Sequence, residues 1–281
     1  MSVAMERSAM EHQTHRHIVS ARRVAYWAAL AFSIAGVSHP AAADDLGGSF
    51  VSKFSRLDSS LWAPSNGWTN GDYWDCAWSR DNVRIKEQTL RLELTKEPLL
   101  GKPFSCAEVQ SRQLYSYGTY EVRMRPAAAS GVVSAFFSYS FPLPETKSNS
   151  EIDIEFLGRD TNKVQLNYLV DGQNEGVTLN DLGFDASSGM NDYAYEWLPD
   201  SLRWYINGKL VREVLRQPGK PFPTHNSKII MMIWNSSKLN DWMGAFENPP
   251  LPLSAYYDWV AFTKAGDKCQ FPESIVCKVK K

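Results

Sequence analysis

The segment EIDIEF at residues 151–156 predicts a β-strand with two different faces. Successive side chains of a strand point to opposite sides of its sheet, so the carboxylates of Glu151, Asp153 and Glu155 share one face. The isoleucine and phenylalanine side chains take the other face, where they can anchor the strand in a hydrophobic core. We therefore expect an acidic surface supported by a buried sheet.

The three carboxylates also predict acid–base chemistry. Cα atoms four residues apart on a strand are separated by roughly 13 Å. Side chains of Glu151 and Glu155 that lean inward would bring their carboxyls into the range of about 5–9.5 Å used by glycosidases. No Lys or Arg lies within the segment, so mutual repulsion should raise at least one carboxyl pKa. A solvated acidic edge strand is the alternative, and the wholly apolar opposite face argues against it.

Many other short runs predict strands, so the sequence indicates an all-β fold. Apolar and charged side chains alternate over Tyr117–Arg125, and Asn207-Gly208 separates two strand-like runs, which is typical of a tight hairpin. With no internal repeat or linker, we expect a single two-sheet β-sandwich. The remaining predicted strands are Leu90–Leu94, Val132–Tyr139, Glu151–Leu157, Val164–Val170, Tyr193–Trp197, Lys228–Trp234 and Tyr256–Thr263.

The N-terminal residues 1–43 predict a secretory signal peptide. Arginines at positions 16, 22 and 23 precede a mostly apolar run over Val24–Val37, which leads into three alanines ending at Ala43. The run is short for a membrane span, although an uncleaved anchor is the alternative. We expect a secreted or periplasmic protein whose residues 44–281 form one catalytic domain, with no membrane partner.

Charge and histidine content exclude several function classes. The net charge is −1 and no compact basic cluster is present, which argues against a nucleic-acid partner. Beyond residue 43 the sequence has a single histidine, His225, which excludes a His-rich zinc site. His225 lies in a Pro-rich stretch typical of a surface loop, so we expect it to be structural or solvent-facing. A Ser-His-Asp triad would depend on that one loop residue. Carboxylates must therefore carry the chemistry.

The four cysteines, all beyond residue 43, indicate disulfides in an oxidising compartment. Four cysteines permit three pairings, of which proximity in sequence favours Cys76–Cys106 and Cys269–Cys277. A metal site is the alternative, but the sequence has no CxxC spacing. The C-terminal segment should be a short tail held by its own bridge.

Tryptophans next to amide and hydroxyl side chains predict a carbohydrate cleft. Nine of the ten tryptophans follow residue 43, among them Trp68 in Gly67–Gly71 and Trp234 in Trp234–Ser236. Any one of them is best explained as a core residue. As a set, flat rings beside hydrogen-bonding groups suit the apolar faces and hydroxyls of sugars.

These features together resemble glycoside hydrolase family 16. The segment EIDIEFLG at residues 151–158 is similar to the catalytic strand of that family, and the wider likeness is to bacterial endo-β-1,3-1,4-glucanases, or lichenases. The tail at 265–271 resembles instead the secreted rhizobial glycanases that trim succinoglycan. Further matching motifs lie at residues 67–71, 105–108, 117–122, 163–168, 182–186 and 257–260.

The resemblance implies a concanavalin-like jelly roll with a concave cleft and a retaining double displacement. Glu151 would be the nucleophile, Glu155 the acid and base, and Asp153 the residue that tunes their protonation. The resemblance also supports the two disulfide pairings above. No cofactor is required, although a structural calcium ion is implied, with Asp258 as its side-chain ligand. The family's cleft positions correspond to Asn70, Glu108, Tyr139, Asn167, Trp234 and Asn235.

Two departures from the lichenase pattern concern the substrate. Asn149-Ser150 stands where lichenases usually have Trp-Asp, and Gln110 where they commonly have Arg. These changes leave the choice between mixed-linkage glucan and succinoglycan open. A non-catalytic β-glucan-binding protein on the same fold is the alternative function. Transglycosylation, in which a sugar replaces water as the acceptor, also stays open. We expect a monomer.

Overall fold

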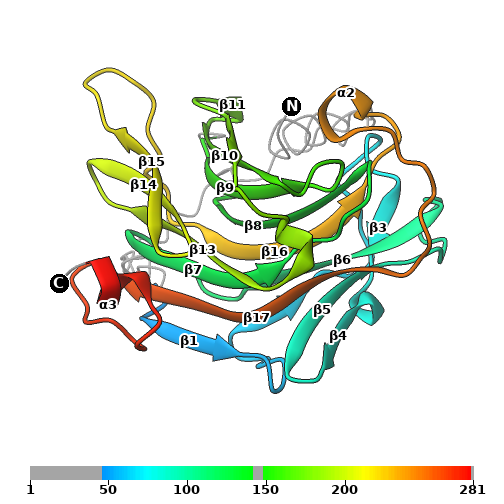
Figure 1. The fold of residues 1–281 in the computed structure, drawn as a ribbon, viewed down its shortest axis with the longest axis horizontal. Helices are drawn as coiled ribbons and strands as arrows, with labels where there is room; N and C mark the ends of the chain where they lie inside the picture. Colours follow the sequence, from blue (N-terminus) through cyan, green and yellow to red (C-terminus); the bar gives the residue numbers. More distant parts are fainter. Residues whose placement is uncertain (1–45, 142–147, 280–281) are drawn as a thin grey trace, which may run out of the picture.

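The chain forms a two-sheet β-sandwich, as the alternating sequence patterns predict (Figure 1). The computed structural model describes residues 46–141 and 148–279, so the predicted signal peptide lies outside the described residues. One sheet follows the order β15-β14-β13-β7-β17-β5-β4, with β1 paired to β17. The other follows β11-β10-β9-β8-β16-β6-β2, with β12 paired to β10 and β3 to β6.

The first sheet comprises β1 (Phe50–Lys53), β4 (Val83–Lys86), β5 (Thr89–Leu94), β7 (Gly118–Arg125), β13 (Asn191–Trp197), β14 (Ser201–Ile206), β15 (Lys209–Leu215) and β17 (Leu253–Lys264). The second comprises β2 (Trp62–Pro64), β3 (Cys76–Trp78), β6 (Phe104–Ser111), β8 (Val132–Tyr139), β9 (Ser150–Leu157), β10 (Lys163–Val170), β11 (Gln173–Asn174), β12 (Thr178–Asp181) and β16 (Lys228–Asn235). Short helical segments are η1 (Arg80–Asn82), η2 (Ala186–Ser188), α2 (Asn240–Met243) and α3 (Ile275–Val279).

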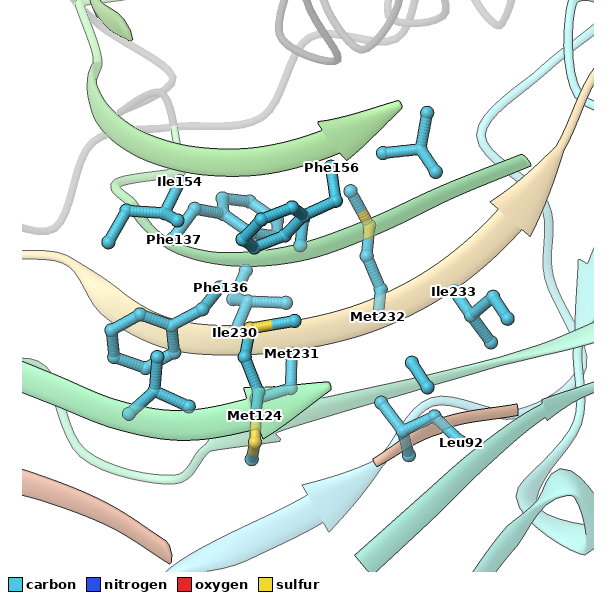
Figure 2. Packing of buried hydrophobic residues seen from close by; sticks show 14 of the residues in the cluster. Leu92, Met124, Phe136, Phe137, Ile154, Phe156, Ile230, Met231, Met232 and Ile233 are labelled. Carbon is cyan, nitrogen blue, oxygen red and sulfur yellow. The ribbon is translucent and has the colours of Figure 1, made fainter. Parts of the chain in front are cut away.

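Buried hydrophobic side chains line the strands of the second sheet, and those that face the first sheet, such as Phe136 and Phe156, form the core between the two sheets (Figure 2). Phe156 of β9 packs edge-on against Tyr193 of β13, with ring centroids 4.9 Å apart. Phe136 of β8 lies 6.0 Å from the ring of Tyr195. The apolar side chains of β9 therefore face the other sheet, which leaves its carboxylates on the opposite, concave face.

The register of the second sheet determines what surrounds these carboxylates. Side chains of directly paired residues in neighbouring strands lie on the same face. Glu151, Asp153 and Glu155 are consequently flanked on both sides by residues of β8 and β10. These neighbours are Tyr139, Phe137 and Ala135 on β8, and Leu169, Asn167 and Gln165 on β10.

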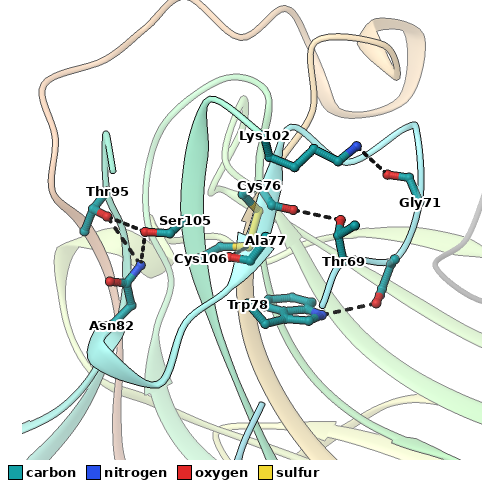
Figure 3. The surroundings of a disulfide bond; sticks show 11 residues. Thr69, Gly71, Cys76, Ala77, Trp78, Asn82, Thr95, Lys102, Ser105 and Cys106 are labelled. Atoms are coloured by element: carbon teal, nitrogen blue, oxygen red, sulfur yellow. Dashed lines mark hydrogen bonds between the residues drawn. A yellow bond between two sulfur atoms is a disulfide. The ribbon is translucent and has the colours of Figure 1, made fainter. Parts of the chain in front are cut away.

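A disulfide ties the loop after β2 to the concave sheet (Figure 3). Cys76 of β3 is bonded to Cys106 of β6, as the sequence favours, with a separation of 30 residues. Closing a loop of this length stabilises the fold by roughly 3–4 kcal/mol in the chain-entropy account. Lys102 Nζ also donates to the carbonyl of Gly71 at 2.8 Å. The loop that contains Asn70 is thus fixed beside β6.

The C-terminal tail packs on the outer face of the first sheet, away from the concave face. It contains the second predicted disulfide, Cys269–Cys277. The buried carboxylate of Glu121 on β7 accepts hydrogen bonds from Ser274 Oγ at 2.6 Å and from the backbone N–H of Ile275 at 2.8 Å. Burial raises the pKa of Glu121, and these two hydrogen bonds act in the opposite direction. The tail therefore covers a carboxylate remote from β9.

No helix within residues 46–141 and 148–279 combines the length and the apolar character needed to cross a bilayer.

Candidate active site

The carboxylates of β9 form a coupled group on the concave face. Asp153 and Glu151 are joined by a side-chain hydrogen bond, which requires a proton between the two carboxyls. Burial raises the pKa of Asp153 well above its usual value, and repulsion from Glu151 and Glu155 raises it further. Asp153 therefore holds the proton and donates it toward Glu151, in agreement with the repulsion expected from the sequence.

Glu155 is held by a separate pair of side chains from β10 and α2. Gln165 Nε2 donates to Glu155 Oε2 at 2.6 Å, and Trp242 Nε1 donates to Gln165 Oε1 at 2.9 Å. The tryptophan therefore fixes which end of the Gln165 amide meets the carboxylate. Burial raises the pKa of Glu155 to about 7, while the hydrogen bond from Gln165 lowers it. Glu155 can accordingly exchange a proton near neutral pH.

Glu108 supplies a fourth buried carboxylate on β6. Its Oε1 accepts hydrogen bonds from Ser65 Oγ at 2.7 Å and from Gln110 Nε2 at 2.6 Å. The register places Glu108 opposite Met232 of β16, and Met232 opposite Ala135 of β8, which pairs with Glu155. Gln110, a departure from the lichenase pattern, is thus a partner of a predicted cleft residue.

Several buried amide and indole groups on this face have unused hydrogen-bonding capacity. Buried polar atoms are normally satisfied, so such atoms indicate a place where a polar ligand binds. Trp78 Nε1 donates to Asn70 Oδ1 at 3.1 Å, and Asn167 Nδ2 donates to Asn174 Oδ1 at 2.7 Å, so each amide has one end occupied. The atoms without a hydrogen-bond partner among the described residues include Asn70 Nδ2, Asn167 Oδ1 and Trp234 Nε1. Both amide atoms of Asn235 also lack a partner, but this predicted cleft residue directly follows Trp234 on β16 and therefore points to the opposite face of the sheet.

Aromatic rings stand next to these amides at one end of the concave face. Trp234 stacks on Trp74, with centroids 3.7 Å apart and ring planes 18° apart. Trp242 lies 6.0 Å from the Trp234 ring. Trp74 and Trp234 are fully buried, so they pack as core residues, and a carbohydrate cleft beside them stays a prediction.

Asn149 and Ser150, the two residues before Glu151 that depart from the lichenase pattern, have different contacts. Asn149 Nδ2 donates to the hydroxyl of Tyr139 at 3.1 Å, and Asn149 Oδ1 accepts from the backbone N–H of Gly172 at 2.8 Å. Ser150 Oγ instead contacts His225 Nδ1 at 3.2 Å and accepts from the backbone N–H of Thr224 at 3.1 Å. Asn149 therefore orients Tyr139, whereas Ser150 and His225 hold a loop in place.

The structure brings the predicted catalytic and cleft residues onto strands of one sheet and the loop beside it. The hydrogen-bonded pair of Gln165 and Trp242 next to Glu155 is not predicted by the sequence. Gln165 could have been found, because it lies two residues before Asn167 on a predicted strand and so shares its face. Trp242 lies in a short helix far along the chain, and the sequence contains no signal that links it to β10.

The predicted calcium ligand Asp258 lies on the first sheet, where the register between β17 and β7 shifts. Its carboxylate lies 3.5 Å from Arg123 Nε, and the same arginine pairs with Asp192 at 2.8 Å. The described residues contain no group of three or more His, Cys, Asp or Glu side chains suited to a metal ion. Because a guanidinium is already next to Asp258, this arrangement does not fit a bound cation.

Comparison with known proteins agrees with this geometry. The family model "Glycosyl hydrolases family 16" matches residues 70–261. An endo-1,3-1,4-beta-glycanase, ExoK, from Rhizobium meliloti (strain 1021) is 40% identical over 233 residues, which cover 83% of this chain and 85% of ExoK. A beta-glucanase from Bacillus subtilis (strain 168) is 43% identical over 219 residues, covering 78% of this chain and 87% of that protein.

A solved structure is similar over the same region. The Bacillus licheniformis beta-glucanase superposes with a TM-score of 0.71 at 41% sequence identity. The match covers 78% of this chain and 99% of that structure. The sandwich described above is therefore the jelly roll of these glucanases.

Proposed function

We propose that this chain, which belongs to family 16 of the glycosyl hydrolases, is an exported endo-β-glycanase that cleaves β-1,3-1,4-linked glucan by a retaining double displacement. The observation that carries the proposal is the alternation of Glu151, Asp153 and Glu155 on one face of β9. The relatives named as glucanases support the class of substrate. Export rests on the predicted signal peptide over residues 1–43.

Glu151 acts as the nucleophile in this proposal. Its carboxylate attacks the anomeric carbon, and the bond between that carbon and the leaving sugar's oxygen breaks. The proton on Asp153 supports this role, because a protonated neighbour donates a hydrogen bond to a carboxylate and stabilises its ionised form.

Glu155 acts first as the acid and then as the base. With a pKa of about 7 it is protonated in slightly acidic solution and can transfer its proton to the departing oxygen. The resulting carboxylate then removes a proton from water, and the water oxygen displaces Glu151 from the anomeric carbon. The chain's own carboxylates supply both steps, so the reaction needs no cofactor.

Purified residues 44–281 should release reducing ends from lichenan, a mixed-linkage β-glucan, with products that initially have the β configuration. The assay measures reducing-end release, and proton NMR follows the first anomer formed. Binding of lichenan without release of reducing ends would favour the non-catalytic glucan-binding alternative. An initial α anomer would contradict the retaining mechanism.

Replacing Gln165 with leucine should move the basic limb of the pH–rate profile to higher pH. The acid step requires protonated Glu155, so kcat/KM on lichenan falls as the pH rises through the Glu155 pKa of about 7. The Gln165 amide stabilises the ionised form, and losing it raises that pKa. Since one hydrogen bond contributes about 1 kcal/mol, the limb should move by about one pH unit.

The control for this experiment is Gln217→Leu, because Gln217 is exposed in the loop after β15. It should leave the pH profile unchanged. A limb that stays at the same pH in Gln165→Leu, or moves toward lower pH, would show that Glu155 is not the group that limits activity at high pH.

A further inference from the structure

A half-buried arginine of the first sheet reaches the strand that borders β9. Arg212 lies on β15, the edge strand of the first sheet, and pairs with Trp204 of β14. Its guanidinium stacks on the indole of Trp204, with Arg212 Cζ 4.6 Å from the ring centroid. Trp204 is fully buried, and its Nε1 donates to the backbone carbonyl of Asp153 at 3.2 Å. Arg212 therefore lies on the side of the second sheet that faces away from the cleft.

The guanidinium ends against two backbone carbonyls at the outer edge of β10. Arg212 Nη1 donates to the carbonyl of Leu166 at 2.6 Å, and Nη2 donates to the carbonyl of Gly176. Hydrogen bonds from a charged donor are stronger than those between neutral groups. Gly176 permits this approach, because a Cβ atom at that position would lie 2.8 Å from Arg212 Nη2. One side chain thus joins β10 to the segment between β11 and β12.

That segment forms a bulge against β10. Leu169 of β10 pairs with Asn174, the last residue of β11. Leu166 of β10 pairs with Thr178, the first residue of β12. The four residue steps from 174 to 178 therefore face only three steps, from 166 to 169, on β10. A bulge leaves backbone groups without ladder partners and turns a side chain in a new direction, and Arg212 supplies a partner on both sides of this one.

The bulge begins at the residue that orients a cleft amide. Asn167 shares the concave face with Asp153, its partner on β9. Asn174 Oδ1 accepts the hydrogen bond from Asn167 Nδ2 at 2.7 Å, which leaves Asn167 Oδ1 to accept from a ligand. Only two residue pairs hold the short strand β11 on β10. The position of Asn174 therefore depends on what secures the bulge that follows it.

We propose that Arg212 is a positioning residue for the substrate: by bonding both sides of the bulge it holds Asn174 in place, and it thereby directs Asn167 Oδ1 at a hydroxyl of the bound glycan. This inference rests on the proposed glycanase function, because the amide lies in the same cleft as the carboxylates. Arg212 acts from the far side of the sheet and does not contact the glycan. Without it, the Asn167 amide can rotate and present either end to the sugar.

Three variants separate positioning from general packing. Arg212→Met keeps an apolar chain next to the indole and removes both hydrogen bonds. Gly176→Ala keeps the charge, but its added Cβ atom displaces Nη2. Arg212→Lys keeps the charge and can donate to one of the two carbonyls, so it should restore part of the loss. The matched control is Arg216→Met, because Arg216 is exposed, also lies over an aromatic ring and also donates to a backbone carbonyl.

The measurements are affinity electrophoresis of residues 44–281 in gels that contain lichenan, which gives Kd, and reducing-end release, which gives kcat/KM. Arg212→Met should raise Kd and lower kcat/KM about tenfold, the size expected when one hydrogen bond to the ligand is lost and its buried partner is left unsatisfied. Gly176→Ala should change both in the same direction. Arg216→Met should keep the wild-type values.

A double-mutant cycle with Asn167→Ala decides whether the effect passes through that amide. If it does, Arg212→Met should change Kd and kcat/KM by less than about twofold once residue 167 is alanine. The basic limb of the pH–rate profile should stay in place, because Trp242 still holds Gln165. Losses that multiply in the double variant, or a basic limb that moves, would show a general loosening of β10 and overturn the proposal.

Failure of the proposed function gives a different result. If the wild type releases no reducing ends from lichenan, the glycanase assignment is wrong. NMR of protein labelled with ¹⁵N-asparagine still decides the role of Arg212, since the side-chain amide signals of Asn167, identified by their loss in Asn167→Ala, need no glycan. These signals should move in Arg212→Met and Gly176→Ala and stay in place in Arg216→Met. Signals that do not move in the first two variants would overturn the proposal.

Discussion

Replacing Glu151 with glutamine is expected to lower kcat on lichenan by about 10⁴-fold or more, because the amide cannot form the glycosyl-enzyme. Glutamine has nearly the same shape, so packing on β9 is preserved. The change also removes one of the carboxylates that raise the pKa of Asp153. The midpoint of thermal unfolding should therefore stay the same or rise.

The experiment combines steady-state kinetics on lichenan with thermal unfolding of the same preparations. Glu247→Gln is a matched control, since Glu247 is exposed in the segment between α2 and β17. It should keep wild-type kcat and stability. A Glu151→Gln enzyme with more than about one hundredth of wild-type kcat would rule out Glu151 as the nucleophile.

The fold could be predicted from the sequence to a large extent. The alternation in Tyr117–Arg125 and 151–156, together with the Asn207-Gly208 turn, indicates strands and a hairpin, and the structure contains them as β7, β9 and the connection between β14 and β15. Alternation is a local property, so it identifies a strand and its two faces. Which strands become neighbours depends on contacts distant in sequence.

The candidate site could be predicted only where its residues share a strand or a family motif. The alternation over 151–156 groups three carboxylates directly. The chain from Trp242 through Gln165 to Glu155 joins a helix and two strands, and no local pattern contains it.

The tail and the two residues before Glu151 differ in whether they contact the cleft. The tail, which resembles that of succinoglycan glycanases, packs around Glu121 on the outer face of the other sheet, so it does not contact the cleft. Of the two residues before Glu151, Asn149 contacts the cleft residue Tyr139, whereas Ser150 anchors the loop at His225. Substrate preference should therefore depend on Asn149 and Gln110 more than on Ser150 or the tail.

Replacing Glu155 with alanine is expected to lower kcat on lichenan by about 10²–10⁴-fold, the usual contribution of general acid–base catalysis. The loss should depend on the leaving group. An aryl β-oligosaccharide with an acidic phenol needs little protonation to depart, so Glu151 can still form the glycosyl-enzyme. Water then attacks slowly, because no base removes its proton.

Azide distinguishes the two glutamates, since it is a nucleophile that needs no base. In Glu155→Ala, azide should attack the glycosyl-enzyme and give a β-glycosyl azide, through two inversions. In Glu151→Ala, azide should enter the space of the missing carboxylate and displace the phenol directly, giving an α-glycosyl azide by one inversion. Proton NMR of the products reports the anomer. If Glu155→Ala gave the α product and Glu151→Ala the β product, the two roles would be reversed, with Glu155 as nucleophile.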